Sequence, residues 1–278
     1  MLRTGDVSVL ATGFNSPEGP AFDRYGNLFF VNWLTSSINR MDPNGTVTEF
    51  HNTGGIPAGL AFHPDGSLWV ADEGDDIHGL MRIDQDGTAE IVVNEYQGAP
   101  LNGANDLVID RNGVIYFSDP WRSGPDNPIG GFYRYFPDGR LEQIDSGLQF
   151  PNGVALNADE SAVYLAETYR MRILRYPIAA DGTIGPGEVW GSTGEPAGPD
   201  GMAFDADGNL YCAHHGGGRV DIFSPAGEQI LKIQIPGASV TNCAFGGPDR
   251  KTLVATEVDT ASLYSVKTQI PGQPLNDR

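Results

Sequence analysis

The chain has 278 residues, and its 17 Lys and Arg against 36 Asp and Glu give a formal net charge of −19 at pH 7. A surface this acidic repels nucleic acid and anionic lipid, which excludes both as favoured partners. No apolar run reaches the roughly 20 residues of a membrane helix, and the first residues lack the apolar segment of a signal peptide. Two cysteines, Cys212 and Cys243, are too few for a disulfide framework. They predict free buried thiols in a reducing cytoplasm.

Short apolar runs alternate with turn signals along the whole chain. One series of turns reads DRYGN, HPDGS, DRNG and DADGN, and a second reads MDPNGTV, IDQDGTA, YFPDGRL, IAADGTI and FSPAGEQ. Gly, Asn and Asp supply the positive φ that tight hairpin turns need. No stretch sustains the 3.6-residue period of an amphipathic helix, so we expect antiparallel strands throughout.

One pattern recurs six times and predicts the architecture. Its copies begin at Glu18, Ala58, Asn105, Asn152, Asp200 and Thr241. The fifth residues of consecutive copies lie 40 to 48 positions apart. A unit of this length with about four strands is typical of a propeller blade. The sequence therefore predicts an all-β fold, a six-bladed β-propeller with four antiparallel strands per blade.

The sixth copy lacks a good fourth strand. After residues 262–268 the chain continues as a proline-containing tail, residues 269–278. The N-terminal segment 6–12 resembles the segments that end other copies, so we expect it to supply the outer strand of the last blade. This pairing would close the ring, remove an exposed edge and make residues 1–278 a single β-propeller domain.

The first residue of each copy falls at the start of an innermost strand, beside the central channel. Four of the six are oxygen donors from different blades: Glu18, Asn105, Asn152 and Asp200. Asp and Asn also open strands for structural reasons, as turn formers. Two carboxylates and two amides that point at one axis are better explained by a hard divalent cation such as Ca²⁺. The absence of His and Cys from these positions disfavours Zn²⁺.

Four segments resemble motifs of the SMP-30/gluconolactonase/luciferin-regenerating-enzyme-like family. They are SPEGPAFD at 16–23, AND at 104–106, PNGVALN at 151–157 and PDGMAFDADGNLYCAHHGGGRV at 199–220. The resemblance covers nearly the whole chain and implies one catalytic divalent metal ion in the channel of a six-bladed propeller. It implies Glu18, Asn152 and Asp200 as ligands, with Asn105 as a further ligand or a substrate contact. Ca²⁺ is the first expectation, and Fe²⁺, Mn²⁺ and Zn²⁺ are the alternatives.

The resemblance also implies hydrolysis of a lactone to a hydroxy acid. The cation would polarise the carbonyl group while a carboxylate acts as general base. We assign the base to Asp200, partly by resemblance, with Asp72, Asp119 and Glu167 at the ends of second strands as alternatives. Relatives with the same four donors hydrolyse organophosphates, so a phosphotriester hydrolase is the enzymatic alternative. A calcium-stabilised propeller that binds peptides without catalysis is the alternative from another class.

One departure from the family pattern bears on the substrate. Sugar-lactone members carry Arg two residues before the Asn that corresponds to Asn105, where this chain has Gly103. A polyhydroxylated lactone would lose that donor, and each unsatisfied buried hydroxyl costs roughly 1–3 kcal/mol. We therefore expect simple or alkyl-substituted γ- and δ-lactones to be better substrates than gluconolactone.

Further substrate contacts are expected from aromatic and histidine side chains. Candidates for apolar walls are Trp33, Trp69, Trp121 and Phe132, although tryptophans also pack between blades. His214 and His215 precede the Gly-rich turn 216–218 and are candidates for the pocket mouth, although a solvated pair of loop histidines is the simpler interpretation. We take Asn105, Trp121 and His214 as the substrate contacts. The expected partner is a small-molecule lactone, and the expected assembly is a monomer or a weak homo-oligomer.

Overall fold

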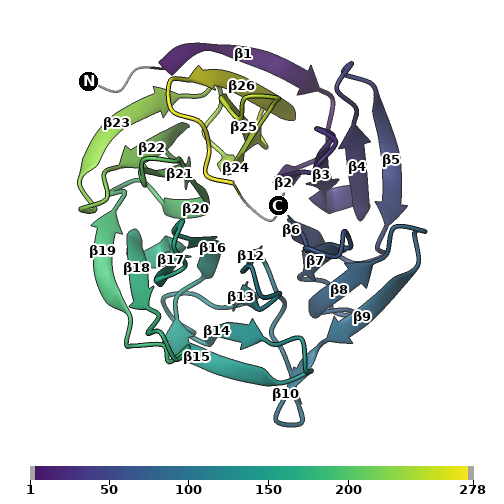
Figure 1. The fold of residues 1–278 in the computed structure, drawn as a ribbon, viewed down its shortest axis with the longest axis vertical. Coiled ribbons are helices and arrows are strands. Elements are labelled where there is room, and N and C mark those ends of the chain that lie inside the picture. The colour runs from purple at the N-terminus through teal and green to yellow at the C-terminus, as the bar shows by residue number, and fades with distance from the viewer. Residues whose placement is uncertain (1–3, 275–278) are drawn as a thin grey trace.

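The computed structural model describes residues 4–274, whose strands form a closed ring around a central channel (Figure 1). Six four-stranded antiparallel sheets follow one another around the ring, and each sheet is one blade. The expected six-bladed β-propeller is confirmed. Helix in the described residues is confined to two 3-10 turns, η1 (Trp33–Thr35) and η2 (Thr168–Arg170). Within this range, no helix has the length and apolar character to span a membrane.

Blades 1 to 3 follow the chain order, and each runs from the channel outward. Blade 1 comprises β2 (Pro17–Phe22), β3 (Leu28–Asn32), β4 (Ser37–Met41) and β5 (Val47–Asn52). Blade 2 comprises β6 (Pro57–Phe62), β7 (Leu68–Asp72), β8 (Gly79–Ile83) and β9 (Ala89–Val93). A short hairpin of β10 (Glu95–Tyr96) and β11 (Ala99–Pro100) precedes blade 3. Blade 3 comprises β12 (Leu107–Ile109), β13 (Ile115–Asp119), β14 (Gly130–Tyr135) and β15 (Leu141–Leu148).

Blades 4 and 5 repeat this arrangement, and blade 6 takes its outer strand from the start of the chain. Blade 4 comprises β16 (Pro151–Leu156), β17 (Ala162–Glu167), β18 (Arg172–Pro177) and β19 (Glu188–Ser192). Blade 5 comprises β20 (Gly198–Phe204), β21 (Leu210–His215), β22 (Arg219–Phe223) and β23 (Gln229–Gln234). Blade 6 comprises β24 (Val240–Gly246), β25 (Thr252–Glu257), β26 (Ser262–Thr268) and β1 (Thr4–Thr12).

The two ends of the chain meet in blade 6. β1 pairs antiparallel with β26, from Thr4 opposite Thr268 to Thr12 opposite Ser262. The expected closure by the N-terminal segment is confirmed, and the strand begins two residues earlier than expected. The C-terminal tail adds no strand to the blade, and Gln273 donates its backbone N–H to the carbonyl of Phe204 in blade 5. Residues 275–278 of the expected tail lie outside the described residues.

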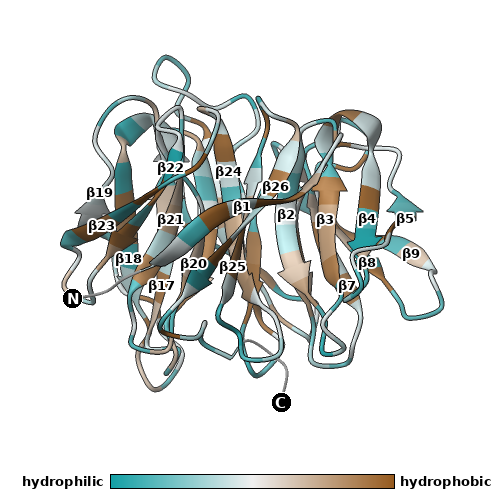
Figure 2. Cartoon of the chain, turned by 90° about the horizontal axis from the view of Figure 1, so that it is seen from above, coloured by the Kyte–Doolittle hydropathy of each residue, from teal (hydrophilic) through white to brown (hydrophobic). Residues whose placement is uncertain are grey.

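Six clusters of buried apolar side chains hold the ring together, one at each interface between neighbouring blades. Between blades 2 and 3, for example, Trp69 and Leu80 pack with Phe117 and Tyr133. Alternation along a strand sends successive side chains to opposite faces of a sheet, so each blade is packed on both faces. Seen edge-on, apolar residues concentrate on the strands and polar residues in the loops (Figure 2). The two cysteines are free and buried in these interfaces, as expected.

Candidate metal centre in the central channel

The four oxygen donors expected from the sequence lie at one end of the channel. Glu18, Asn152 and Asp200 occupy the second or third position of β2, β16 and β20, and Asn105 lies two residues before β12. These are the innermost strands of four different blades (Figure 1). The electrostatic influence of Asp200 on Glu18 reflects this shared location.

Glycine next to a donor lets the inner strands approach closely. A Cβ atom on Gly19 would lie 2.1 Å from the carbonyl oxygen of Ala58, and one on Gly153 would lie 2.2 Å from that of Asp200. Any larger residue at these positions would push the neighbouring blades apart. The narrow channel therefore depends on glycine directly after the donor position.

In blades 3 and 6 a polar side chain replaces this glycine and bridges to the next blade. Asp106 Oδ2 accepts a hydrogen bond of 2.9 Å from the backbone N–H of Val154 in blade 4. Asn242 Nδ2 donates a hydrogen bond of 3.1 Å to Glu18 Oε2 in blade 1. Both residues lie beside the candidate centre, and the sequence analysis missed them. The signal was the interruption of a position that is otherwise glycine.

Asn152 provides the clearest sign that the donors fit a cation. Its side chain donates to the carboxylate of Asp200, and its own Oδ1 atom is buried without a hydrogen-bond partner among the described residues. Leaving a buried polar atom unpaired costs about 1–3 kcal/mol. An amide carbonyl oxygen is a ligand that hard cations accept.

A further buried carboxylate, Glu73, stands beside Asn105. It follows β7 in blade 2 and is only 2% exposed. Its Oε1 atom accepts a hydrogen bond of 2.8 Å from Asn105 Nδ2, and its Oε2 atom accepts one of 3.1 Å from Trp33 Nε1. The inner strand of blade 2 carries Ala58 at the donor position. Glu73 therefore supplies the side-chain oxygen atoms that blade 2 places beside the candidate centre. Glu73 was not among the site residues predicted from the sequence either.

Four carboxylates thus share this end of the channel. Burial raises the pKa of Glu73 and the pKa of Asp106 to about 7. Burial, followed by the charges of Asp200 and Asp106, raises the pKa of Glu18 well above its usual value. Burial, followed by the charges of Asp106 and Glu73, does the same for the pKa of Asp200. Such a cluster of negative charges is the environment that a divalent cation stabilises.

The donor set fits a hard cation rather than a thiolate or imidazole metal. It combines the carboxylates of Glu18 and Asp200 with the amides of Asn105 and Asn152. Across residues 4–274, no three His, Cys, Asp or Glu side chains form a metal-binding group by themselves. Binding would therefore depend on the two amide oxygens together with the two carboxylates, a combination suited to Ca²⁺.

The other carboxylates considered as general base serve the loops between blades. Each accepts a hydrogen bond from a backbone N–H of the loop that leads into its own inner strand: Ile56 to Asp72, Gly103 to Asp119 and Gln149 to Glu167. Glu167 also pairs with Arg172 at 2.6 Å. These contacts favour the structural explanation for the acidic residues at the ends of the second strands.

Two of the four aromatic candidates lie near the donors. The ring centroids of Trp33 and Trp121 are 6.2 Å apart with an interplanar angle of 67°, and both residues are half-buried. Beside them, a Cβ atom on Gly103 would lie 2.8 Å from Trp121 Cβ and 2.9 Å from the carbonyl oxygen of Glu73. Trp69 and Phe132 instead pack between blades.

His214 does not line a pocket mouth. Its side chain is fully buried, with Nδ1 2.7 Å from Asp221 Oδ2 and Nε2 2.8 Å from the carbonyl oxygen of Pro196. Both ring nitrogens are thus engaged within the protein, which argues against the expected substrate contact. The interpretation as a solvated loop residue is wrong for His214. The imidazole of His214 connects the end of β21 to β22 and to the loop before β20.

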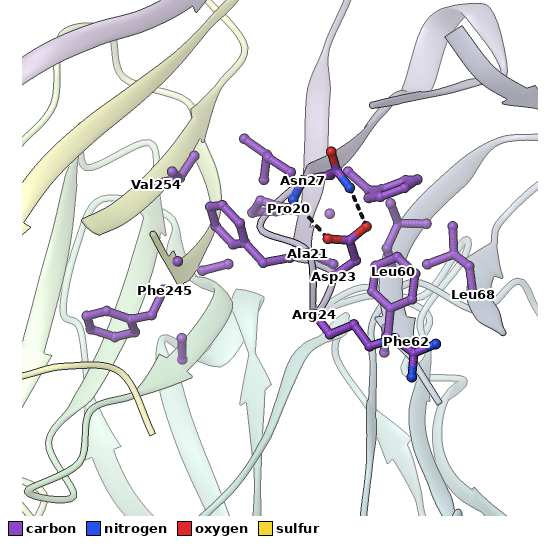
Figure 3. A pocket seen from close by; sticks show the side chains of 18 of the residues that line it. Pro20, Ala21, Asp23, Arg24, Asn27, Leu60, Phe62, Leu68, Phe245 and Val254 are labelled. Atoms are coloured by element: carbon purple, nitrogen blue, oxygen red, sulfur yellow. Dashed lines mark hydrogen bonds between the residues drawn. The ribbon is translucent and has the colours of Figure 1, made fainter. Parts of the chain in front are cut away.

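A large cavity lies at the opposite end of the channel. Its volume is about 1440 Å³, and turns such as 23–27 and 63–66 line it. Figure 3 shows Asp23 accepting hydrogen bonds from Asn27, with Phe62 and Phe245 among the surrounding apolar side chains. The turns follow the inner strands, whereas the donors begin them. Asp106 and Asn242 also line this cavity, which therefore extends to the inner strands below the candidate centre.

The chain is similar to proteins of known family. The sequence model described as the SMP-30/Gluconolactonase/LRE-like region matches residues 16–259. The chain belongs to this family. Within the SMP-30/gluconolactonase/LRE-like family, a gluconolactonase of Zymomonas mobilis is 32% identical over 280 residues, with 86% of this chain and 76% of that protein covered. The residues matched by the family model, 16–259, include Glu18, Asn105, Asn152 and Asp200.

Two further relatives of the family show its range. A diisopropyl-fluorophosphatase of Loligo vulgaris is 31% identical over 287 residues, which cover 92% of this chain and 90% of that protein. The solved structure of a gluconolactonase from Xanthomonas campestris superimposes with a TM-score of 0.84 at 25% identity. The superposition covers 95% of this chain and 89% of the Xanthomonas campestris chain. The propeller is thus shared over nearly its whole length.

Proposed function

We propose that the protein is a metal-dependent lactonase, which hydrolyses a cyclic ester to a hydroxy acid. The observation that carries the proposal is the set of four oxygen donors at one end of the channel, with Asn152 Oδ1 buried and unpaired. The 32% identical relative named gluconolactonase supports this reaction class. This relative is an enzyme, which speaks against a purely structural binding module.

The donors Glu18, Asn105, Asn152 and Asp200 would hold a divalent cation, with Ca²⁺ as the first choice and Fe²⁺, Mn²⁺ or Zn²⁺ as alternatives. When bound, the cation would supply Lewis-acid polarisation of the ester carbonyl and offset the negative charges nearby. Asp200 is 6% exposed and receives a side-chain hydrogen bond from Asn152, which orients its carboxylate. This orientation suits a general base that takes a proton from the attacking water.

The bonds change in a simple order. The water oxygen forms a bond to the carbonyl carbon as Asp200 accepts the proton. The bond from that carbon to the ring oxygen then breaks, and the proton passes to the ring oxygen, which becomes the hydroxyl of the product. Atoms and charge balance without any other reactant. Asp200 takes up one proton in the first step and releases it in the second, so it is regenerated at the end of each turnover.

We further propose that the substrate carries apolar rather than hydroxylated groups. Trp33 and Trp121 offer an aromatic wall near Asn105, and Trp121 closes the space beside Gly103 where a donor side chain would stand. Simple or alkyl-substituted γ- and δ-lactones match such a wall. Trp121 and Asn105 are the side chains that we assign to substrate contact.

Phosphotriester hydrolysis is the second candidate, favoured by one observation. The relative named diisopropyl-fluorophosphatase covers 92% of this chain. The test compares a δ-lactone with diisopropyl fluorophosphate on the same metal-loaded protein. We expect a kcat/KM at least tenfold higher for the lactone, and an Asp200→Asn variant with lactone activity reduced at least a hundredfold. A higher kcat/KM for the fluorophosphate would overturn the lactonase proposal.

We also propose a cytoplasmic, single-domain protein. The unpaired thiols of Cys212 and Cys243 suit a reducing compartment, and strands from both ends of the chain share blade 6.

A further inference from the structure

Glu73 connects three consecutive blades through two side-chain hydrogen bonds. Trp33 Nε1 in blade 1 donates to one carboxylate oxygen at 3.1 Å, and Asn105 Nδ2 in blade 3 donates to the other at 2.8 Å. The Glu73 side chain is 2% exposed, so water does not compete freely for these bonds. Each carboxylate oxygen therefore has one donor from a neighbouring blade.

The bond to Asn105 fixes the direction of its side-chain amide. An asparagine carries its two donors on Nδ2 and its acceptor on Oδ1, on opposite sides of the amide carbon. Because Nδ2 is turned toward Glu73, Oδ1 is turned away from it. The inner strand of blade 2 carries Ala58 at the donor position, and alanine has no side-chain acceptor for the Asn105 amide.

We propose that Glu73 is a positioning residue for the metal centre, which holds the Asn105 amide with its carbonyl oxygen free for the cation. This inference rests on the proposed function, because it takes Asn105 as a ligand. Trp33 has a supporting role, since its indole N–H satisfies the second carboxylate oxygen. Trp33 and Glu73 are equivalent in the repeat, each directly after the second strand of its blade.

Trp33 and Asn105 each need one acceptor oxygen on residue 73, so substitutions that change the number of acceptors or donors test the proposal. A Glu73→Gln variant keeps a single acceptor oxygen, for which Trp33 and Asn105 must compete, and its new NH₂ group would face the other donor. Adding Trp33→Phe removes one of the two donors. The glutamine oxygen is then available to Asn105 alone, so the double variant should regain the orientation that the single variant loses.

The measurement is the Ca²⁺ affinity by isothermal titration calorimetry, with thermal melting to verify that each variant folds. We expect Glu73→Gln to weaken Ca²⁺ binding at least tenfold, and Trp33→Phe to change it threefold or less. We expect the double variant to bind at least threefold more tightly than Glu73→Gln. These two variants carry the same charge, so their difference reports orientation and not electrostatic attraction.

A matched control is available two residues along the chain. Asp75 is 73% exposed and pairs with Arg122 at the surface. Its substitution, Asp75→Asn, removes the same charge without touching Asn105, and it should change the affinity less than twofold. A double variant that binds no more tightly than Glu73→Gln would overturn the inference.

Crystal structures of chelator-treated wild type and Glu73→Ala separate this inference from the proposed function. We expect one Asn105 orientation in the wild type and several in the variant, whatever the metal affinity. An unchanged single orientation in Glu73→Ala would overturn the positioning role. A wild type that binds no divalent cation in calorimetry would instead overturn the proposed metal centre and, with it, the consequence for binding.

Discussion

Asn242 of the last blade donates a hydrogen bond to Glu18 of the first blade, with 3.1 Å between Nδ2 and Oε2. The neighbouring Thr241 Oγ1 donates a second bond, of 3.0 Å, to the carbonyl oxygen of Pro17. Both bonds cross the interface at which the ring closes. One proposed metal ligand therefore belongs to the seam of the propeller, which couples the state of the candidate centre to the closure of the ring.

Substitution of Asn242 should reveal this coupling. We expect Asn242→Ala to lower the free energy of unfolding of the metal-free protein by about 1–3 kcal/mol, because the half-buried Glu18 carboxyl loses its partner. Saturation with Ca²⁺ should reduce that loss, since the cation would interact with the same carboxylate. Urea unfolding with and without Ca²⁺ measures both quantities. An equal loss in the two conditions would argue against the coupling.

Removal of metal should affect both activity and stability. We expect exhaustive chelation to abolish lactone hydrolysis and to lower the melting temperature, because a ligand of the folded state stabilises it by mass action. Ca²⁺ at 100 times its Kd should restore about 2.7 kcal/mol. Glu18→Gln should raise the Kd, because it removes one of the two carboxylate ligands. Full activity in a sample shown to be free of metal would contradict the mechanism.

The metal-free protein should become less stable as the pH rises. Burial raises the pKa of Glu73 and of Asp106 to about 7, while the same groups ionise near pH ~4 in an unfolded chain. Between these values the folded state holds protons that the unfolded state has released, so unfolding becomes easier with increasing pH. We expect a chelated sample to melt at a lower temperature at pH 8 than at pH 5.5. A Ca²⁺-loaded sample, in which the ionised forms are favoured, is the control and should show a smaller decrease.

The aromatic side chains of Trp33 and Trp121 should favour lactones with apolar substituents over hydroxylated lactones. We expect alkyl-substituted γ- and δ-lactones to have a higher kcat/KM than gluconolactone, because Gly103 offers no side-chain donor and Trp121 occupies the adjacent space. Steady-state kinetics on metal-loaded enzyme with both substrate types provide the measurement. A tenfold advantage for gluconolactone, about 1.4 kcal/mol in transition-state binding, would show that other groups bind the hydroxyls. The metal assignment would be unaffected by that result.

The repeat made the ring predictable from the sequence. Each copy keeps the same alternation and turn chemistry, so the number of blades and the place of Glu18 and Asp200 on inner strands could be predicted. Ring closure was also predictable, because segment 6–12 has the character of an outer strand. Asp106 and Asn242 were visible in principle as exceptions to glycine, but their bridges to the next blade depend on the spacing between blades.

Glu73 and His214 lay beyond what the repeat could predict. Glu73 directly follows the second strand β7, and His214 is the penultimate residue of the second strand β21. The direction of each side chain is set by contacts with other strands or loops. Glu73 turns inward because Trp33 and Asn105 donate hydrogen bonds to its carboxylate. The imidazole of His214 is held by contacts with Asp221 Oδ2 and the carbonyl oxygen of Pro196. Sequence spacing contains no record of these partners.

The pairing of β1 with β26 has a consequence for synthesis on the ribosome. Among the described strands, β1 is synthesised first and its partner β26 last. Blades 1 to 5 can form from contiguous segments during translation. β1 has no strand to pair with until β26 has been synthesised. Most of its side chains are exposed even in the finished ring, as its pattern from Thr4 to Thr12 shows. A strand with mostly exposed side chains tolerates contact with water before it pairs, so we expect the pairing of β1 with β26 to be the last step of folding.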